Sequence, residues 1–165
     1  MRDSIYSLKL RRRGVLLGSA ADLSILRRLT ARQVPSVPHV AVRMQDPISQ
    51  LLELNRSYQV IDFIVVDDNE RYLGMITAQD LRTALLEREA IPLLLVEDLV
   101  RTNLPSIDPD ETLDRVLDKF SRNDVASLPL TTSGSAKDGD RAGQVLGLVT
   151  RARLLQRYQQ ALREF

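Results

Sequence analysis

A nine-residue element occurs twice in this 165-residue chain and constrains its fold more than any other feature. The first copy, Leu73–Leu81, reads LGMITAQDL, and the second copy, Leu146–Leu154, reads LGLVTRARL. The glycine, the apolar pair, the threonine and the final leucine recur, but Arg153 stands where the first copy has Asp80. Self-similarity of this kind indicates that one supersecondary unit is present twice and that the two copies pack together.

The similarity extends upstream of both copies. With a shift of 65 positions, apolar residues fall on apolar residues from about residue 32 to residue 66, so that Ile48 matches Leu113. The second copy has eight additional residues within 131–144, a stretch rich in Thr, Ser, Gly and Asp that predicts a flexible surface loop. Each copy has the pattern strand, helix, strand, strand, helix. The sequence therefore predicts an α+β fold of two β-α-β-β-α repeats packed about a pseudo-twofold axis.

The helices of the repeats are predicted from their caps and apolar faces. We expect helices over 47–57, 79–89, 108–124 and 152–164, the third with Asp108 as N-cap, Pro109 in the first turn and Glu111 three residues after the cap. Two apolar stripes mark the covered faces of two of these helices, and periodicity does not decide whether the core or another subunit covers them. The stripes are Ile48, Leu51 and Leu52 in one helix and Leu113, Val116, Leu117 and Phe120 in the other.

Composition and motifs argue against several classes of protein. The chain has 23 Lys and Arg against 22 Asp and Glu, a net charge of +1, which argues against a general nucleic-acid-binding protein. It has no cysteine, which excludes disulfides and thiolate chemistry. His39 is the only histidine, and no phosphate-binding loop, zinc-protease motif or hydrolase nucleophile motif is present. We therefore expect no enzyme activity, no catalytic residues and no metal site.

The repeated element and the strand before it resemble the CBS domain. The carrying features are the stretch IVVDDNERYLGMITAQDL and the pattern G-h-h-T-x-x-D-L, where h is apolar, which occurs in full once and with Arg153 in place of the aspartate once. On this resemblance, Leu29–Leu162 is identified as a tandem pair of CBS domains, called a Bateman module. We expect a basic linker over 1–28, a first repeat over 29–90 and a second repeat over 91–165. The resemblance also implies a homodimer formed through the helices, with the two apolar stripes described above as the candidate contacts.

The resemblance implies a ligand for the cleft between the repeats. Such clefts often bind an adenosine nucleotide, and the matching positions here are Thr77 and Asp80 in the first copy and Thr150 and Arg153 in the second. The aspartate would accept hydrogen bonds from the ribose hydroxyls, and the threonine at the helix start would meet a phosphate. Arginine carries only donors, so Arg153 cannot receive a ribose but can pair with a phosphate. No cofactor is required on this reading, and ATP, ADP and AMP are the candidate ligands.

A second interpretation of Thr77 and Asp80 needs no ligand. A threonine at a helix start with an aspartate three residues later is also an N-cap with an acidic first turn, which stabilises a helix by about 1 kcal/mol. The sequence leaves both interpretations open.

The first residues carry a narrower resemblance. The stretch DSIYSLKLRRRGVLLGSAADLSILRRL, 3–29, is similar to the segment that joins the last membrane helix to the cytoplasmic CBS pair of CLC-type chloride channels and transporters. This resemblance implies a regulatory domain of a voltage-gated chloride channel, involved in chloride transport and dimer assembly. It would lie on the cytoplasmic side of the cell membrane, in an integral membrane protein. The membrane-embedded domain would be its partner, with the basic cluster Lys9–Arg13 near the membrane surface. The alternative is a stand-alone soluble CBS-pair adenylate sensor that acts on a protein partner.

Overall fold

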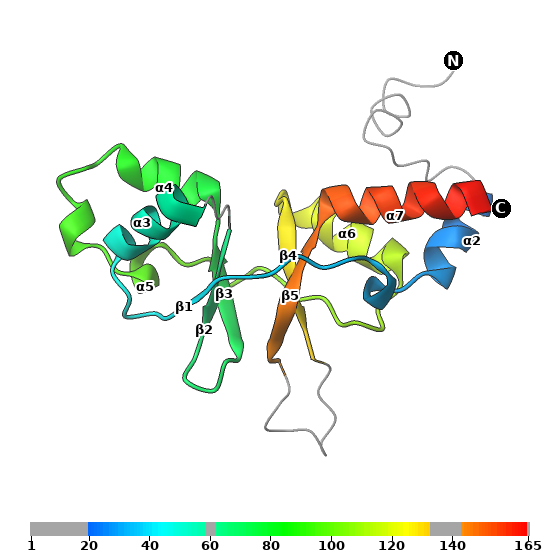
Figure 1. Ribbon diagram of the computed structural model, residues 1–165, viewed down its shortest axis with the longest axis horizontal. Helices are drawn as coiled ribbons and strands as arrows, with labels where there is room; N and C mark the ends of the chain where they lie inside the picture. The colour runs from blue at the N-terminus through cyan, green and yellow to red at the C-terminus, as the bar shows by residue number, and fades with distance from the viewer. Residues whose placement is uncertain (1–19, 59–61, 133–142, 165) are drawn as a thin grey trace.

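The computed structural model describes residues 20–58, 62–132 and 143–164. The basic cluster Lys9–Arg13 and most of the predicted loop 131–144 lie outside these ranges. Two lobes lie side by side, and the strands of each lobe face the strands of the other at the centre (Figure 1). The helices lie at the outer ends, so the molecule has the duplicated α+β architecture that the repeat predicts.

The first lobe contains a three-stranded sheet in the order β1-β2-β3. Strand β1 is parallel to β2, and β2 is antiparallel to β3. The elements of this lobe are β1 (Ala41–Val42), α3 (Ile48–Tyr58), β2 (Phe63–Val66), β3 (Tyr72–Ile76), α4 (Ala78–Leu85), the 3-10 helix η2 (Ile91–Leu93) and α5 (Val96–Leu99).

The second lobe contains the antiparallel pair β4-β5. An isolated parallel bridge between Ile107 and Leu130 takes the place that β1 has in the first lobe. The elements of this lobe are α2 (Ala20–Arg28), the 3-10 helix η1 (Ala31–Gln33), α6 (Leu113–Asn123), β4 (Ser127–Thr131), β5 (Val145–Thr150) and α7 (Arg151–Glu164).

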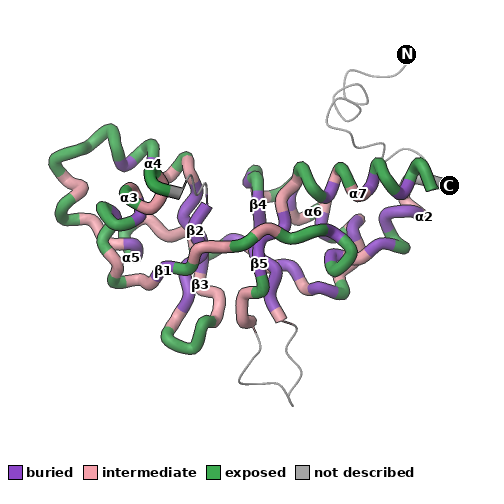
Figure 2. Tube along the Cα trace, viewed as in Figure 1, coloured by how far each residue is buried: buried purple, intermediate pink, exposed green. Residues whose placement is uncertain are grey.

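Strand β2 is buried on both of its faces. Phe63 and Val65 pack in the cluster formed with α3 and α4, whereas Ile64 and Val66 pack in the cluster that contains the second lobe. All four residues are at most 1% exposed, and Figure 2 shows the buried trace concentrated along the central strands. The uninterrupted apolar sequence of this strand follows from its position between helices on one side and the other sheet on the opposite side.

Each lobe is completed by backbone from the other repeat. The Ile48 N–H donates to the Leu94 carbonyl at 2.9 Å, and the Leu113 N–H donates to the Leu29 carbonyl at 3.0 Å. These two bonds join positions that differ by the same 65 residues as the sequence repeat. The segments 29–32 and 94–97 are therefore exchanged reciprocally between the lobes.

This exchange corrects the predicted start of α6. The helix begins at Leu113, with Thr112 as N-cap, and not at Asp108. The carbonyls of Pro109 and Glu111 accept hydrogen bonds from the backbone of η1, both at 2.9 Å, so these residues pair with another segment and cannot be helical. Asp108 instead stabilises a turn, because its carboxylate accepts from a backbone N–H two residues later, at 2.8 Å.

The apolar stripes proposed as dimer contacts lie in the core of the single chain, so that prediction is wrong. Leu52 and Leu117 are partly exposed. The remaining stripe residues are at most 1% exposed: Ile48, Leu51, Leu113, Val116 and Phe120. Helices α3 and α6 use these faces to cover their own lobes, and a dimer contact would need other surfaces.

Residues within the predicted linker 1–28 also reach the core. Helix α2 packs against α6 and α7 of the second lobe (Figure 1). Ile25 and Leu26 of this helix are 8% and 2% exposed. The described end of that segment therefore contributes apolar side chains to the second lobe.

Candidate functional site

The threonine of the first repeated element caps the helix that follows it. Thr77 is the N-cap of α4 and is 9% exposed. Its hydroxyl accepts from the Asp80 N–H at 3.3 Å, and its own N–H donates to Asp80 Oδ2 at 3.0 Å. This reciprocal arrangement is a capping box, so the helix-capping interpretation of the motif is realised in the structure.

The carboxylate of Asp80 has a second partner, Arg101, which belongs to neither copy of the motif. The Arg101 Nε lies 3.1 Å from both carboxylate oxygens, and its terminal nitrogen lies 2.7 Å from Oδ1. The Asp80 side chain is 15% exposed and that of Arg101 is 39% exposed. We call Thr77, Asp80 and Arg101 the first-repeat site.

The ionisation of Asp80 follows from these contacts. Burial raises the pKa of this carboxyl group, but the hydrogen bonds from Arg101 and Thr77 and the positive charge of Arg101 outweigh burial. The pKa therefore lies below its ordinary value, and Asp80 is a charged acceptor at neutral pH.

The glycine of the motif is explained by the position of Arg101. The backbone of Arg101 pairs with Met75 in β3 in both directions, at 3.1 and 2.9 Å. A Cβ atom on Gly74 would lie 2.4 Å from the Arg101 carbonyl oxygen and 2.7 Å from a methyl group of Val100. Only glycine therefore lets this segment lie on β3 and bring Arg101 to Asp80.

The second copy repeats the backbone but not the charges. The Thr150 hydroxyl accepts from the Arg153 N–H at 3.1 Å. Val37 pairs with Leu148 of β5 through two bonds of 2.9 Å and so takes the place that Arg101 has in the first repeat. The Arg153 side chain is exposed, and no ion pair joins it to any of the described residues. We call Thr150, Arg153 and Val37 the second-repeat site.

A buried hydrogen bond joins the two repeats beside the first-repeat site. The Ser127 hydroxyl donates to Asp62 Oδ2 at 2.6 Å, and the Ala78 N–H donates to Asp62 Oδ1 at 3.2 Å. Asp62 and Ser127 occupy equivalent positions of the repeat and are 8% and 3% exposed. Asp62 thus places a carboxylate at the start of α4. The equivalent position before α7 is Ser127, which carries no charge. The repeat register contains this pair, but nothing in the sequence alone indicates that the two side chains meet.

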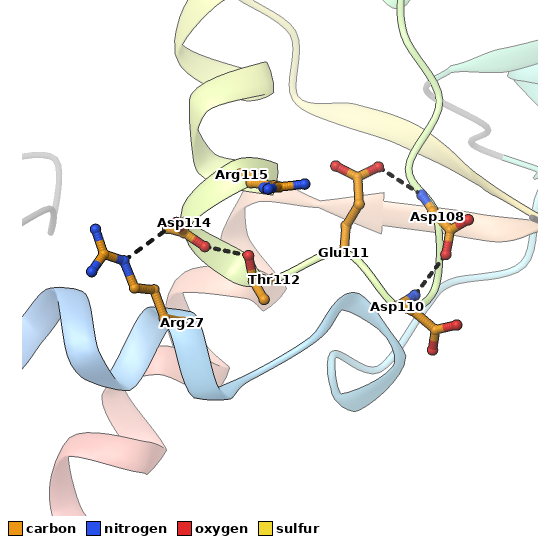
Figure 3. Close-up of a pocket in the computed structure, with 7 residues that line it drawn as sticks. All are labelled: Arg27, Asp108, Asp110, Glu111, Thr112, Asp114 and Arg115. Atoms are coloured by element: carbon orange, nitrogen blue, oxygen red, sulfur yellow. Dashed lines mark hydrogen bonds and ion pairs between the residues drawn. The ribbon is translucent and has the colours of Figure 1, made fainter.

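A hollow of about 610 Å³ opens elsewhere, between α2 and the start of α6 (Figure 3). It is lined by Arg27, Asp108, Asp110, Glu111, Thr112, Asp114 and Arg115. Its carboxylates already accept hydrogen bonds from backbone N–H groups or form ion pairs with arginines. Their negative charges disfavour the binding of an anionic nucleotide in this hollow. Across the residues that the structure describes, no group of three or more Asp, Glu or His side chains is arranged to hold a metal ion.

Comparisons with known proteins show what this architecture matches. The family model of the CBS domain matches residues 31–87 and 96–160. The CBS domain pair of protein MJ0100, solved with 5′-methylthioadenosine and S-adenosyl-L-methionine, is 20% identical, with a TM-score of 0.64 over 80% of this chain and 97% of that one. The CBS-pair protein CBSX2 from Arabidopsis thaliana is 19% identical, with a TM-score of 0.66 over 81% of this chain and 96% of that one. CBSX2 has also been solved in complex with AMP.

A curated relative is a much longer protein. Inosine-5′-monophosphate dehydrogenase of Aquifex aeolicus (strain VF5) is 25% identical over 111 residues, which are 67% of this chain. The chain spans only 21% of that relative's length.

These comparisons correct the expected location. The prediction that the chain belongs to an integral membrane protein at the cytoplasmic side of the cell membrane is wrong, because solved structures that it matches over nearly their whole length, such as CBSX2, are CBS pairs. In 20–58, 62–132 and 143–164, no helix is both long enough and apolar enough to cross a bilayer.

The family model covers most of the chain in two consecutive segments, and the structure shows two matching lobes with their strands face to face. The chain belongs to the CBS domain family and is a tandem pair of CBS domains.

Proposed function

We propose that this CBS pair is a regulatory module whose first-repeat site binds an adenine nucleotide, with AMP, ADP and ATP as the candidate ligands. The observation that carries this proposal is the Asp80 carboxylate, which is ionised, only 15% exposed and held in one orientation by Thr77. The complexes of CBSX2 with AMP and of MJ0100 with two adenosine derivatives support this ligand class.

The chemistry of the site suits a nucleoside. The two hydroxyls of a ribose are donors, and a charged acceptor forms the stronger kind of hydrogen bond with them. The Thr77 hydroxyl acts as an acceptor toward the Asp80 N–H, which leaves its proton to donate to a phosphate oxygen. Because the capping box already fixes Asp80, little ordering is needed when the ribose arrives.

The second-repeat site has a different capability. Arg153 places an exposed guanidinium where the first copy has its carboxylate, and Thr150 offers one hydroxyl. We propose that Thr150 and Arg153 contact a phosphate only, since neither residue supplies a charged acceptor for a ribose.

Regulation would follow from the position of the first-repeat site. Arg101 belongs to the second repeat and Asp80 to the first, so a ligand on Asp80 acts on a contact between the repeats. A ligand changes the arrangement of the two repeats only if it binds one arrangement more tightly than another. The target would be a protein partner, and a homodimer of the pair remains a prediction that sedimentation would test.

The chloride-channel domain, which is the main expectation from the sequence, receives no support from the comparisons, and they favour the stand-alone alternative. The family match begins at residue 31, and most of the segment that carries the channel resemblance lies outside the described residues. The proposed activity is therefore that of an adenylate-sensing CBS pair.

Calorimetric titration with AMP, ADP and ATP tests the proposal. Asp80→Asn keeps the shape of the cap but removes the charge, so nucleotide binding should weaken by about 10- to 100-fold, the equivalent of one charged hydrogen bond of about 1.5–3 kcal/mol. Asp118→Asn, which changes an exposed aspartate of α6, is the matched control and should bind as the unmodified chain does. Absence of heat at millimolar nucleotide, or equal binding by both variants, would refute the proposal.

A further inference from the structure

The carboxylate that would receive the ribose already has three donors. One terminal nitrogen of Arg101 lies 2.7 Å from Oδ1 of Asp80, and the single Nε–H of Arg101 is shared between Oδ1 and Oδ2, at 3.1 Å from each. The Thr77 N–H donates to Oδ2 at 3.0 Å. A carboxylate has about four acceptor positions, so these donors leave one position for the two hydroxyls of a ribose. The carboxylate can therefore accept both hydroxyls only if Arg101 withdraws, because the bond from Thr77 belongs to the helix cap.

Arg101 can release Asp80 only by moving its side chain. Its backbone is paired in both directions with Met75, and its carbonyl lies so close to Gly74 that a Cβ atom there would be 2.4 Å away. The side chain is 39% exposed and can turn about its flexible stem. A guanidinium that has lost its carboxylate then has two donors in a fork, the geometry that a phosphate matches.

We propose that Arg101 makes the first-repeat site selective for phosphorylated adenosines over adenosine itself, by passing from Asp80 to the phosphate as the ribose takes its place. This inference rests on the proposed function of the site. Adenosine breaks the pair between Asp80 and Arg101 and offers no anion in return. A nucleotide breaks the same pair and supplies a new anionic partner for Arg101, the phosphate that is bonded to its 5′ oxygen.

The second-repeat site shows what the exchange requires. Val37 stands at the position of Arg101 and Arg153 at the position of Asp80, so that site has no carboxylate to receive a ribose and no cation to be released. The selectivity is therefore a property of the first repeat alone.

The test is calorimetric titration of the full chain, Arg101→Ala, Arg101→Gln and the control Arg88→Ala with adenosine and with AMP. The unmodified chain should bind AMP about tenfold more tightly than adenosine, and so should the control, because Arg88 is an exposed residue that lies beyond the end of α4 and outside the first-repeat site. In Arg101→Ala, AMP binding should weaken by about threefold while adenosine binding tightens by about threefold, so that the ratio of their dissociation constants approaches one. Arg101→Gln keeps most of the side-chain length and gives the same comparison if the alanine variant unfolds.

The outcomes separate the two proposals. If both ligands bind and the ratio is unchanged in the Arg101 variants, this inference is overturned and the nucleotide site stands. If neither ligand binds to the unmodified chain or to any variant, the proposed function fails and the inference fails with it. Tighter adenosine binding in Arg101→Ala, with weaker AMP binding, supports both.

Discussion

The two lobes share one backbone and differ in the charges placed on it. In the first, Asp80 and Arg101 form a fork of bonds beside the start of α4. In the second, the corresponding positions are Arg153 and Val37, and α7 begins without an acidic residue in its first turn. The backbone pairing of Arg101 with β3 and of Val37 with β5 is nevertheless the same. Duplication therefore preserved the hydrogen-bonded frame and left the side chains of each site free to change.

The largest expected effect tests the close backbone approach that both lobes share, of Arg101 to β3 and of Val37 to β5. Gly74→Ala places a Cβ atom 2.4 Å from a backbone oxygen of Arg101 and should lower the free energy of unfolding by about 1–3 kcal/mol. Gly147→Ala meets its nearest atom, the Val37 carbonyl oxygen, at 3.1 Å and should cost less than about 1 kcal/mol. Urea unfolding of both variants measures the difference, and equal losses would show that the two approaches are equally tight.

The next effect concerns the contact between equivalent positions of the two repeats. Ser127→Ala removes the hydroxyl that donates to buried Asp62 and leaves that oxygen without its partner, at a cost of about 1–3 kcal/mol. Ser121→Ala in α6 removes an exposed hydroxyl and should change the free energy of unfolding by less than about 0.5 kcal/mol. Chemical denaturation compares the two, and a neutral Ser127→Ala would show that Asp62 finds another donor.

A smaller effect depends on pH. The pKa of Asp80 is lower in the folded protein than its ordinary value of 3.8, so the folded state binds fewer protons at this group. Its contribution to stability is present above about pH 4 and is lost as the pH falls through the lower folded pKa. Because Arg101 is more than one-third exposed, we expect at most about 1 kcal/mol.

Unfolding of the unmodified chain and of Asp80→Asn between pH 6 and pH 3 measures this contribution. Their difference in free energy should narrow toward acid pH. In an Arg101→Ala background it should be smaller throughout. A difference that widens as the pH falls would contradict the assigned direction.

The smallest effect sharpens the contrast between α4 and α7. Arg153 lies in the first turn of α7, where a positive charge opposes the helix dipole, so Arg153→Asp should raise the free energy of unfolding by about 0.5 kcal/mol. Arg163→Asp makes the same change in the last turn and should act in the opposite direction. Thermal unfolding at low salt measures both, and a loss of stability in Arg153→Asp would indicate that this arginine has a partner that is favourable to the fold.

The repeat architecture and the helix cap of the first-repeat site could be predicted from the sequence, because both depend on local patterns. The 65-residue register recurs in the hydrogen bonds of Ile48 and Leu113, and the cap of Thr77 with Asp80 follows from the spacing of two side chains in one turn. The start of α6 could not be predicted in this way. Asp108 and Glu111 have the pattern of a helix cap, but pairing with η1 takes their segment out of the helix.

The partner of Asp80 could not be predicted for a related reason. Arg101 lies 21 positions away and outside the repeated motif, and it reaches the site only because its segment is laid on β3 of the first lobe. Gly74 is the signal in the sequence for this approach. A glycine within a strand indicates that another backbone lies close to it, but it does not identify that backbone. The apolar stripes show the same limit, because periodicity indicates a covered face but not what covers it.

The exchanged segments 29–32 and 94–97 also bear on how such a molecule can be divided. A polypeptide that held one repeat would present its leading segment with no partner in the same chain, and a second copy would complete it, as in a domain-swapped dimer. That dimer would carry two identical sites, so any substitution would fall on both at once. Joining the copies in one gene gives each site its own codons, and a carboxylate can then be lost at one position while it is kept at the other.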